Sequence, residues 1–334
     1  MHLKIATPVV FRINRQLMAI ECPLPAEDWM NKIVEAITPV HLKKRLDQER
    51  EIDFSYFIPG IGRFRTNLFQ QRGQWCLAMR YVKTLVPSFQ ELGLLEQIKG
   101  IAESPRGIVL VAGSTGCGKS TTLAAMIEHI NASYKKHIIT LEDPIEYAFQ
   151  NNKATIEQRE VGNDVPTFEG GLRHVLRQDP DVILVGEMRD LETTSAAITA
   201  AETGHLVLST LHTVNAPQTI ERIIDIYPSD QQNQIRSMLA NTLQAVISQT
   251  LFKRIDQPGM IPGVEIMLCT PAVRNCIREN RIFELPNIIA TSRQLGMQTL
   301  DDSIKQLYVN GYISREDAVA QAAHPEKLDR ALVA

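Results

Sequence analysis

The sequence has few cysteines and no cysteine pair at metal-binding spacing. Its five cysteines are odd in number and scattered, and no C-x-x-C motif occurs among Cys22, Cys76, Cys117, Cys269 and Cys276. Paired spacings are what structural zinc sites and disulfide frameworks require. We therefore expect neither, which is typical of a protein kept in a reducing compartment.

Long hydrophobic runs and an excess of positive charge are also missing. No apolar stretch approaches the roughly 20 residues that span a bilayer, and no signal-peptide pattern opens the sequence. The 38 acidic residues outnumber the 35 Lys and Arg residues, which gives a formal net charge of -3. Because no apolar run is long enough, we expect no transmembrane segment. Because no global positive field exists, we expect no direct nucleic-acid binding.

The composition is that of an ordinary globular protein, with 44% hydrophobic and 22% charged residues. A length of 334 residues suggests about two domains. Composition and pattern place a first domain at residues 1–83, a link at 84–106 and a second domain at 107–334. The link is proposed because prolines and glycines are spaced through it, around one short helical stretch.

The first domain reads as a mixture of strands and helices. Leu3–Glu21 is strand-like, with a turn at Asn14-Arg15, and Pro25–Ile37 has the spacing of an amphipathic helix. Glu51–Lys83 then predicts an antiparallel meander, because alternating strand patterns are separated by glycine-containing turns.

Arginines lie on the predicted meander. Residues two apart share a strand face, so Arg63, Arg65 and Asn67 project together, while Arg80 lies on the face opposite a hydrophobic row. Such a row is usually a solvated sheet face. Arginines on a rigid strand are also what a phosphate group requires, so the residues by themselves leave both interpretations open.

A phosphate-binding motif opens the second domain. Gly113, Gly118, Lys119 and Ser120 fill the fixed positions of G-x-x-x-x-G-K-[ST], between an apolar strand at Ile108–Ala112 and a helix-forming segment. A strand that turns into a helix N-terminus points backbone N–H groups at an anion. Lys119 would reach the β- and γ-phosphates, and the Ser120 hydroxyl would ligate Mg²⁺. The predicted nucleotide-binding loop comprises Gly113, Ser114, Thr115, Gly116, Cys117, Gly118, Lys119, Ser120 and Thr121.

Carboxylates follow two further predicted strands. His137–Asp143 ends in Glu142 and Asp143, with Glu146 just beyond, and Asp181–Glu187 ends in Glu187. Ligands of open α/β sheets bind at the carboxyl ends of parallel strands. A Mg-nucleotide needs one carboxylate to hold the metal and one to orient the attacking water. Residue chemistry does not divide these roles between Glu146 and Glu187, and a single strand-end carboxylate could equally cap a helix.

The remaining segments carry weaker signals. His212 follows a strand at Leu206–Leu211 and would be either a structural hydrogen-bonding residue or a sensor of the γ-phosphate. Beyond Pro228 an apolar stripe that runs as far as Leu251 predicts helices. Thr270-Pro271 is a good N-cap and first-turn pair for the helix AVRNCIREN.

These motifs together resemble the secretion-superfamily P-loop ATPases (the GspE/PilB/PilT-like family), most closely the type IV pilus retraction ATPases. ITLEDPIEY matches the Asp box of that family, DVILVGEMRD its Walker B segment, and STLHTVNA its His box. AVRNCIRE is similar to the AIRNLIRE motif of retraction enzymes, with Val and Cys at two positions. The family usually opens with a further helix and strand, so this sequence begins at the equivalent of a later point.

The resemblance implies an α/β fold with an N-terminal PAS-like α+β domain and a RecA-like P-loop ATPase domain with a helical C-terminal part. It implies ATP and Mg²⁺ as ligands, and a cytoplasmic homo-hexamer docked at the inner membrane through a pilus platform protein. The roles it implies are general base for Glu146, metal binding through water for Glu187, and charge stabilisation for Arg65, Arg80 and Arg63.

Other functions remain open at this stage. An accessory retraction paralogue or another secretion ATPase would share all of these motifs, although the assembly-type relatives usually carry a four-cysteine motif that is missing here. A RecA-like nucleic-acid translocase is disfavoured because no basic groove interleaved with aromatic residues is present. A nucleotide-binding regulator without turnover is disfavoured by the two well-placed glutamates.

Overall fold

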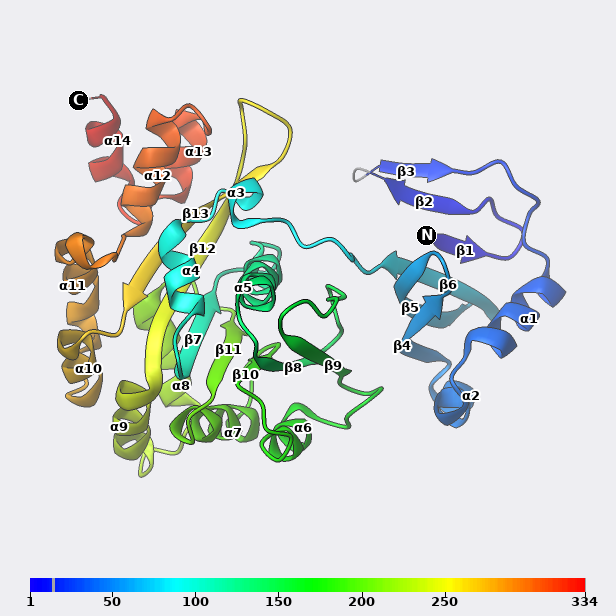
Figure 1. Cartoon of the computed structure of the whole chain (residues 1–334). Helices are drawn as coiled ribbons and strands as arrows, with labels where there is room; N and C mark the ends of the chain where they lie inside the picture. The colour runs from blue at the N-terminus through cyan, green and yellow to red at the C-terminus, as the bar shows by residue number, and fades with distance from the viewer. Residues whose placement is uncertain (14–15, 334) are drawn as a thin grey trace. The chain divides into compact units, whose positions relative to one another are not determined.

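The computed structural model describes residues 1–13 and 16–333, which form two compact units (Figure 1). The first unit comprises Met1–Leu85 and two short segments from later in the chain, Pro144–Ala148 and Gly162–Asp164. The second unit comprises the rest of the described chain. The turn predicted at Asn14-Arg15 lies outside the described residues.

The first unit is built on a six-stranded antiparallel sheet in the order β3-β2-β1-β6-β5-β4. Its last three strands run consecutively, so the predicted meander is confirmed. The strands are β1 (His2–Lys4), β2 (Val10–Ile13), β3 (Gln16–Ala19), β4 (Glu51–Ile58), β5 (Gly62–Gln71) and β6 (Gln74–Tyr81).

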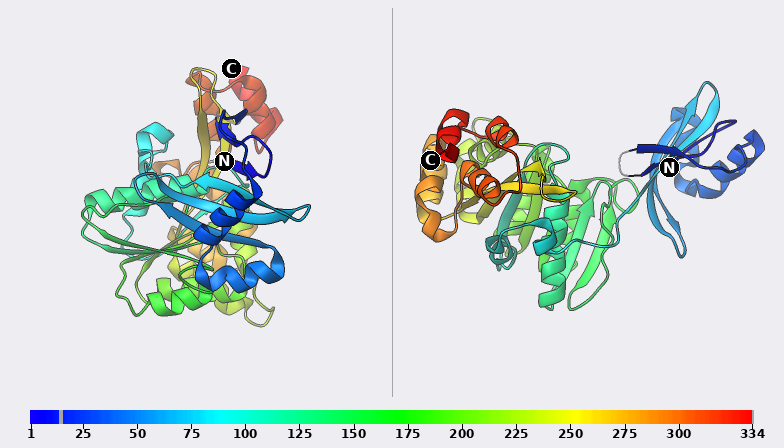
Figure 2. Two further views of the ribbon diagram at one scale, coloured as in Figure 1. Left: turned by 90° about the vertical axis from the view of Figure 1, so that its right-hand side faces the viewer. Right: turned by 90° about the horizontal axis from the view of Figure 1, so that it is seen from above.

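The helices α1 (Glu27–Ile37) and α2 (Lys43–Glu49) lie on one face of this sheet (Figure 2). Met30 and Val34 of α1 pack against Leu68, Leu77 and Met79 of the sheet in one apolar cluster. Because strand residues alternate between faces, burying this row turns the neighbouring residues of β5 and β6 to the opposite face. A 3₁₀ turn at Val40–Leu42 connects the two helices.

The second unit is an α/β structure around a seven-stranded mixed sheet, in the order β13-β12-β7-β11-β10-β8-β9. Neighbouring strands are parallel except for the β12–β13 hairpin. The strands are β7 (Gly107–Ala112), β8 (His137–Glu142), β9 (Thr155–Glu160), β10 (Val182–Val185), β11 (Leu206–Leu211), β12 (Leu243–Lys253) and β13 (Met260–Leu268).

Helices cover both faces of this sheet, which is why β7 is buried along its whole length. Ile108 and Leu110 join one core, whereas Val109 and Val111 join the other. The helices are α3 (Phe89–Leu92), α4 (Glu96–Ala102), α5 (Lys119–Ser133), α6 (Phe168–Val175), α7 (Leu191–Glu202), α8 (Ala216–Asp225), α9 (Gln232–Thr242), α10 (Pro271–Arg278), α11 (Leu285–Thr291), α12 (Leu300–Val309), α13 (Arg315–Gln321) and α14 (Pro325–Val333), with 3₁₀ turns at Ile282–Glu284 and Arg293–Leu295.

The segment expected to be a link between domains contributes to a core. From Val86 onward the chain belongs to the second unit. Phe89 of α3 and Ile98 and Ile101 of α4 pack with α5 and the sheet. Burying these apolar side chains stabilises the folded state by roughly 25 cal/mol per Å² of apolar surface. A solvent-exposed linker would not gain this free energy.

The helical prediction beyond Pro228 was right for α9 and wrong for the residues that follow. Val246, Ile247 and Leu251 lie on strand β12, not on a helix. β12 pairs in parallel with β7 and in an antiparallel hairpin with β13, so its side chains are buried on both faces. A fully buried strand is apolar without alternation, and its pattern is therefore easily mistaken for that of a buried helix.

The last three helices, α12 to α14, close over the end of the β12–β13 hairpin. Phe252 and Ile261 of the hairpin form a separate small core with Ile304, Leu307 and Leu328. No helix in the described part of the chain is long and apolar enough to cross a membrane.

Candidate functional site

The predicted phosphate loop joins β7 to α5 and takes backbone shapes that favour glycine. Gly113, Gly116 and Gly118 have φ values of 146°, 81° and 94°. A Cβ on Gly113 would lie 2.4 Å from the Cys117 Sγ and 2.5 Å from the Gln249 carbonyl oxygen. The loop is therefore wound as tightly as a phosphate-binding loop requires. Gly118 is also the N-cap of α5, so no side chain occupies the space in front of the first-turn N–H groups.

The ammonium group of Lys119 lies inside this loop. Its Nζ donates to the carbonyl oxygens of Gly113 at 2.8 Å and Ser114 at 3.0 Å, and the side chain is buried. A buried cation at a helix N-terminus provides a strong attraction for an anion, because both the charge and the helix dipole favour it.

His212 and Glu187 lie next to Lys119, at the edge of the sheet formed by the carboxyl ends of the strands. The His212 Nδ1 lies 3.4 Å from the Lys119 Nζ, and its Nε2 lies 3.4 Å from the Glu187 Oε2. Because an ammonium group can only donate, Nδ1 accepts and the ring proton sits on Nε2, facing the carboxylate. Glu187 is also paired with Arg189 at 2.7 Å. The carboxyl ends of β7, β11 and β10 thus bring Lys119, His212 and Glu187 together.

Glu142 and Asp143 lie at the end of the next strand, β8. The Glu142 Oε1 accepts hydrogen bonds from the Thr140 hydroxyl at 2.7 Å and from the Gln158 amide at 3.2 Å. Asp143 is exposed. The Gly186 N–H donates to the Leu141 carbonyl oxygen at 2.8 Å, which ties the ends of β10 and β8 to each other.

Glu146 and the three predicted arginines belong to the first unit. Glu146 is exposed on the segment Pro144–Ala148, whose Ala148 N–H donates to the Lys83 carbonyl oxygen at 3.0 Å. The sequence pattern predicts that Glu146 lies within the 107–334 domain, whereas its segment belongs to the first unit. Pro144, two residues after the end of β8, ends the strand pattern. This proline was the only signal in the sequence that the segment leaves the sheet.

The arginines occupy the sheet face that the helices leave free. Arg65 and Arg80 are directly opposite each other in the β5–β6 pair, and Arg63 precedes Arg65 on the same face. Like charges directly opposite each other on neighbouring strands destabilise the pair.

Two further residues of the site lie where sequence reasoning gave no signal. Gln249 of β12 hydrogen-bonds to the phosphate loop, in a segment predicted to be helical. Glu265 of β13 accepts from the Ala216 N–H at 2.8 Å and from the Ser248 hydroxyl at 3.2 Å. Glu265 therefore holds the N-terminus of α8, which directly follows the loop that carries His212.

Burial raises the pKa of Glu265, although both hydrogen bonds act in the opposite direction. A carboxyl group with a raised pKa binds its proton more tightly in the folded state, so it contributes most to stability when protonated. That contribution is lost as pH rises through the pKa of the folded state. We expect the Tm of Glu265→Gln, relative to wild type, to increase from about pH 5 to about pH 8.

Thermal unfolding across this range measures the effect, because the Gln side chain still accepts the Ala216 N–H. Glu279→Gln, at the exposed C-cap position of α10, is the matched control and should show the same pH dependence as wild type. A Tm difference for Glu265→Gln that stays constant with pH would contradict the prediction.

The helix that carries the AVRNCIRE motif is α10, and its predicted cap is confirmed. The Thr270 hydroxyl accepts from the Val273 N–H, while Val273 and Cys276 are buried. Arg274 donates to the carbonyl oxygens of Ala240 and Asn241 at the end of α9, which satisfies two helix C-terminal groups.

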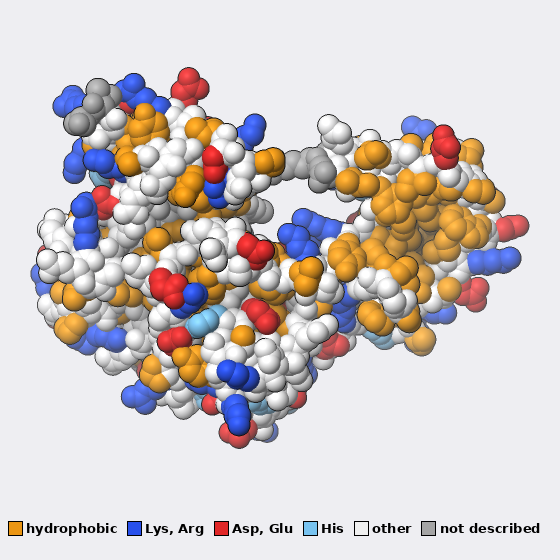
Figure 3. Space-filling view, turned by 45° about the horizontal axis from the view of Figure 1, so that its top comes forward, with side chains coloured by type: hydrophobic (Ala, Val, Ile, Leu, Met, Phe, Trp, Pro, Cys, Tyr) orange, Lys and Arg blue, Asp and Glu red, His pale blue; other side chains and the backbone are white. Residues whose placement is uncertain are grey.

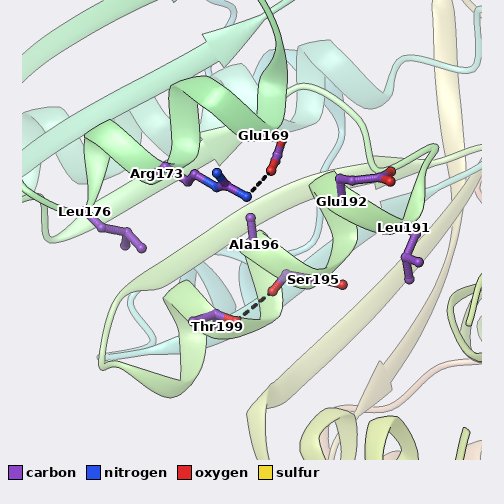
Figure 4. A pocket seen from close by; sticks show the side chains of 8 residues that line it. All are labelled: Glu169, Arg173, Leu176, Leu191, Glu192, Ser195, Ala196 and Thr199. Carbon is purple, nitrogen blue, oxygen red and sulfur yellow. Dashed lines mark hydrogen bonds and ion pairs between the residues drawn. The ribbon is translucent and has the colours of Figure 1, made fainter. Parts of the chain in front are cut away.

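A separate pocket of about 430 Å³ lies between α6 and α7 (Figure 4). Its apolar wall comes from Leu176, Leu191 and Ala196, and its Glu169–Arg173 pair is bridged at 2.5 Å. None of the predicted nucleotide-site residues lines it, so this pocket is not the phosphate site.

The side chains present fit a Mg-nucleotide. The tight glycine loop and the Lys119 ammonium suit phosphate oxygens, and Ser120 and Glu187 supply the oxygen ligands that Mg²⁺ prefers. In the described residues, no group of three or more His, Cys, Asp or Glu side chains could hold a metal ion without other ligands. Mg²⁺ usually keeps waters and takes substrate phosphates as ligands, so this arrangement is the expected one.

Comparison with known proteins finds the same architecture elsewhere. Residues 3–262 match the family described as type II/IV secretion system protein. The type IV pilus retraction ATPase PilT of Pseudomonas aeruginosa is 44% identical over 326 residues, which cover 98% of this chain and 94% of that protein. The type IV pilus ATPase PilU of the same organism is 40% identical over 316 residues, covering 94% and 82%.

A solved structure shares the fold along almost the whole chain. The crystal structure of the pilus retraction motor PilT with bound ADP superposes with a TM-score of 0.91 at 41% identity, covering 98% of this chain and 94% of that one. The family match spans more than half of the sequence and includes both the phosphate loop and the strand ends around it. The chain therefore belongs to the type II/IV secretion system protein family.

Proposed function

We propose that this chain is an ATPase that powers type IV pilus retraction, as a homo-hexameric motor. The observation that carries the proposal is the convergence of Lys119, His212 and Glu187 at the phosphate loop, in a chain similar along its length to retraction ATPases. ATP is the substrate and Mg²⁺ its counter-ion. In this proposal the first unit corresponds to a PAS-like domain and the second unit, which includes α3 and α4, to a RecA-like ATPase domain.

The phosphate loop binds the β- and γ-phosphates. Backbone N–H groups of the loop and the Lys119 ammonium neutralise their charge, and the Ser120 hydroxyl lies at the position that ligates Mg²⁺. Glu187 would hold Mg²⁺ through water, and His212, which lies between Glu187 and Lys119, would respond to the γ-phosphate. Bound Mg²⁺ neutralises charge that develops on the phosphate oxygens.

Glu146 is the general base, which orients and deprotonates the attacking water. An exposed carboxylate keeps the mobility to approach a bound phosphate when the protein closes. The segment Pro144–Ala148 carries it, and this segment packs with the first unit, although its two ends continue into the second. Motion of the first unit would therefore move the base, which couples hydrolysis to a rigid-body movement.

Arg65, Arg80 and Arg63 stabilise negative charge during phosphoryl transfer. Two directly opposed arginines repel each other in the absence of an anion, so their pairing is costly unless a phosphate is the third partner. An arginine that acts on the transferring phosphoryl group is worth about 10³–10⁵ in rate. This is a physical reason to keep the pair despite its cost.

The exposed apolar side chains of the first unit support assembly into a ring. Hydrophobic side chains gather on the face of this unit that Figure 3 shows. On both faces of its sheet, large apolar side chains are exposed, and Leu17, Met18 and Phe57 are each more than half exposed. Large exposed apolar areas usually mark interfaces between proteins. In the proposal a neighbouring copy covers them, and the ring docks at the cytoplasmic face of the inner membrane on the pilus platform protein, without direct contact to nucleic acid.

Deletion of the gene in the native host tests the function. We expect surface pili to remain while their retraction stops, and complementation with the wild-type chain, but not with Lys119→Ala, to restore it. A host that still retracts its pili at the normal rate would contradict the proposal.

An accessory role in retraction is a second candidate, because the chain is also 40% identical to PilU. In that case deletion would slow retraction or weaken it under load without abolishing it. Stimulation of ATP hydrolysis by DNA at physiological salt would instead favour a translocase.

A further inference from the structure

Gln249 lies directly behind the phosphate loop. It belongs to β12, which pairs with β7, the strand that leads into the loop; the last paired residues are Ser248 and Ala112. Its side chain is 3% exposed, and its own carbonyl oxygen is one of the two atoms that a Cβ on Gly113 would strike. Gln249 therefore touches the loop through both its backbone and its side chain.

Two hydrogen bonds fix the direction of the Gln249 amide. Its Nε2 donates to the Cys117 carbonyl oxygen at 2.6 Å, and its Oε1 accepts from the Thr122 hydroxyl at 2.8 Å. The first bond reaches the body of the loop, and the second reaches the first turn of α5. One side chain thus joins the two parts of the anion-binding turn, and both of its polar ends are satisfied.

The bond to Cys117 has a consequence for the next peptide group. A peptide bond is planar and trans, so its C=O and the following N–H point in opposite directions. Holding the Cys117 carbonyl toward β12 turns the Gly118 N–H away from β12, toward the side on which the phosphates are expected. Gly118 has a φ of 94°, so without this restraint the peptide has other accessible orientations.

We propose that Gln249 is a positioning residue that presents the Gly118 N–H to the nucleotide phosphates. The inference rests on the proposed function as a nucleotide-binding ATPase, and it concerns binding of the phosphate group rather than the chemical step. Gln249 acts through the loop and does not touch the nucleotide.

Gln249→Met keeps the length of the side chain and removes both hydrogen bonds. We expect Mg·ADP and inorganic pyrophosphate to bind the full-length variant about 10- to 100-fold more weakly, since the misaligned Gly118 N–H no longer donates well to the charged phosphate. Isothermal titration calorimetry measures both dissociation constants. The two ligands should lose affinity equally, because the defect lies at the phosphates and not at the base. Gln244→Met, on the same strand beside Gly107, is the control and should bind as wild type.

Gln249→Glu separates positioning from packing. Its second oxygen replaces the donor that faces the Cys117 carbonyl, so the ionised form repels the loop and the protonated form restores the bond. Burial and the facing carbonyl both favour the protonated form, whereas the Lys119 ammonium on the other side of the loop acts in the opposite direction. The affinity of Gln249→Glu for Mg·ADP, divided by that of wild type at the same pH, should therefore recover as pH falls from about 8 to about 6.

The outcomes separate this inference from the proposed function. A folded Gln249→Met that binds both ligands as tightly as wild type would overturn the positioning role while the ATPase assignment stands. A penalty in Gln249→Glu that does not change with pH would also overturn it, and this arm decides the matter if Gln249→Met does not fold. Failure of the wild-type chain to bind Mg·ADP would contradict the proposed function itself.

Discussion

Lys119→Ala is expected to weaken Mg·ADP binding by about 10²–10⁴-fold and to abolish measurable ATP hydrolysis. Hydrogen bonds to charged groups are worth about 1.5–3 kcal/mol each, and the ammonium can make two with oxygen atoms of the β-phosphate, the terminal phosphate of ADP. The side chain is already buried among the loop carbonyls, at the place where the phosphates are expected. Calorimetry with Mg·ADP and a phosphate-release assay measure the two effects.

Lys253→Ala provides the matched control for the charge change. Lys253 is exposed at the end of β12, in the same unit and outside the loop, and its loss should leave binding and hydrolysis at wild-type values. Wild-type affinity of folded Lys119→Ala for Mg·ADP would show that the phosphates bind elsewhere.

Glu146→Gln is expected to retain ATP binding and to lose hydrolysis by about 10²–10⁴-fold, the usual contribution of a positioned general base. The amide keeps the shape of the side chain but cannot take a proton from water. Since Glu146 is exposed in the structure, the substitution should not disturb folding. Single-turnover hydrolysis together with nucleotide-binding measurements distinguishes the two effects.

Glu187→Gln gives the contrasting result if the roles are divided as proposed. It should raise the Mg²⁺ concentration needed for half-maximal hydrolysis and also lower the rate, because in the proposal the carboxylate helps to hold the metal. Glu202→Gln, exposed on α7, is the control. Hydrolysis by Glu146→Gln at the normal rate would refute the assignment, and Glu187 would then be the next candidate for the base.

The phosphate loop was predictable because its parts are contiguous. Gly113 through Thr121 follow an apolar strand and run into the first turn of α5, and the glycines required for positive φ values stand in the motif itself. The strand ends that carry Glu187 and His212 could also be anticipated, since parallel strands present their carboxyl ends at one edge of a sheet. Local pattern and one topological rule were sufficient for these residues.

Other parts of the site depend on contacts that no local pattern encodes. His212 approaches Lys119 from 93 residues away, and Gln249 bonds to Thr122 across 127 residues. The β12 segment resembled a helix because its neighbours β7 and β13 bury both of its faces. Glu146 lies in the first unit because the Ala148 N–H of its segment donates a hydrogen bond to the Lys83 carbonyl oxygen.

The amino-acid sequence by itself determined the α/β class, the phosphate loop, the arginine strand and the acidic strand ends, because each depends on residues adjacent in the chain or on strand periodicity. Only the tertiary structure decided which residues hold the loop from behind, which unit carries Glu146, and that Arg65 faces Arg80 across two strands. These features depend on strand register and on packing between segments that are distant in the sequence. The same local pattern is compatible with many pairings of segments, and only the folded structure shows which pairing forms.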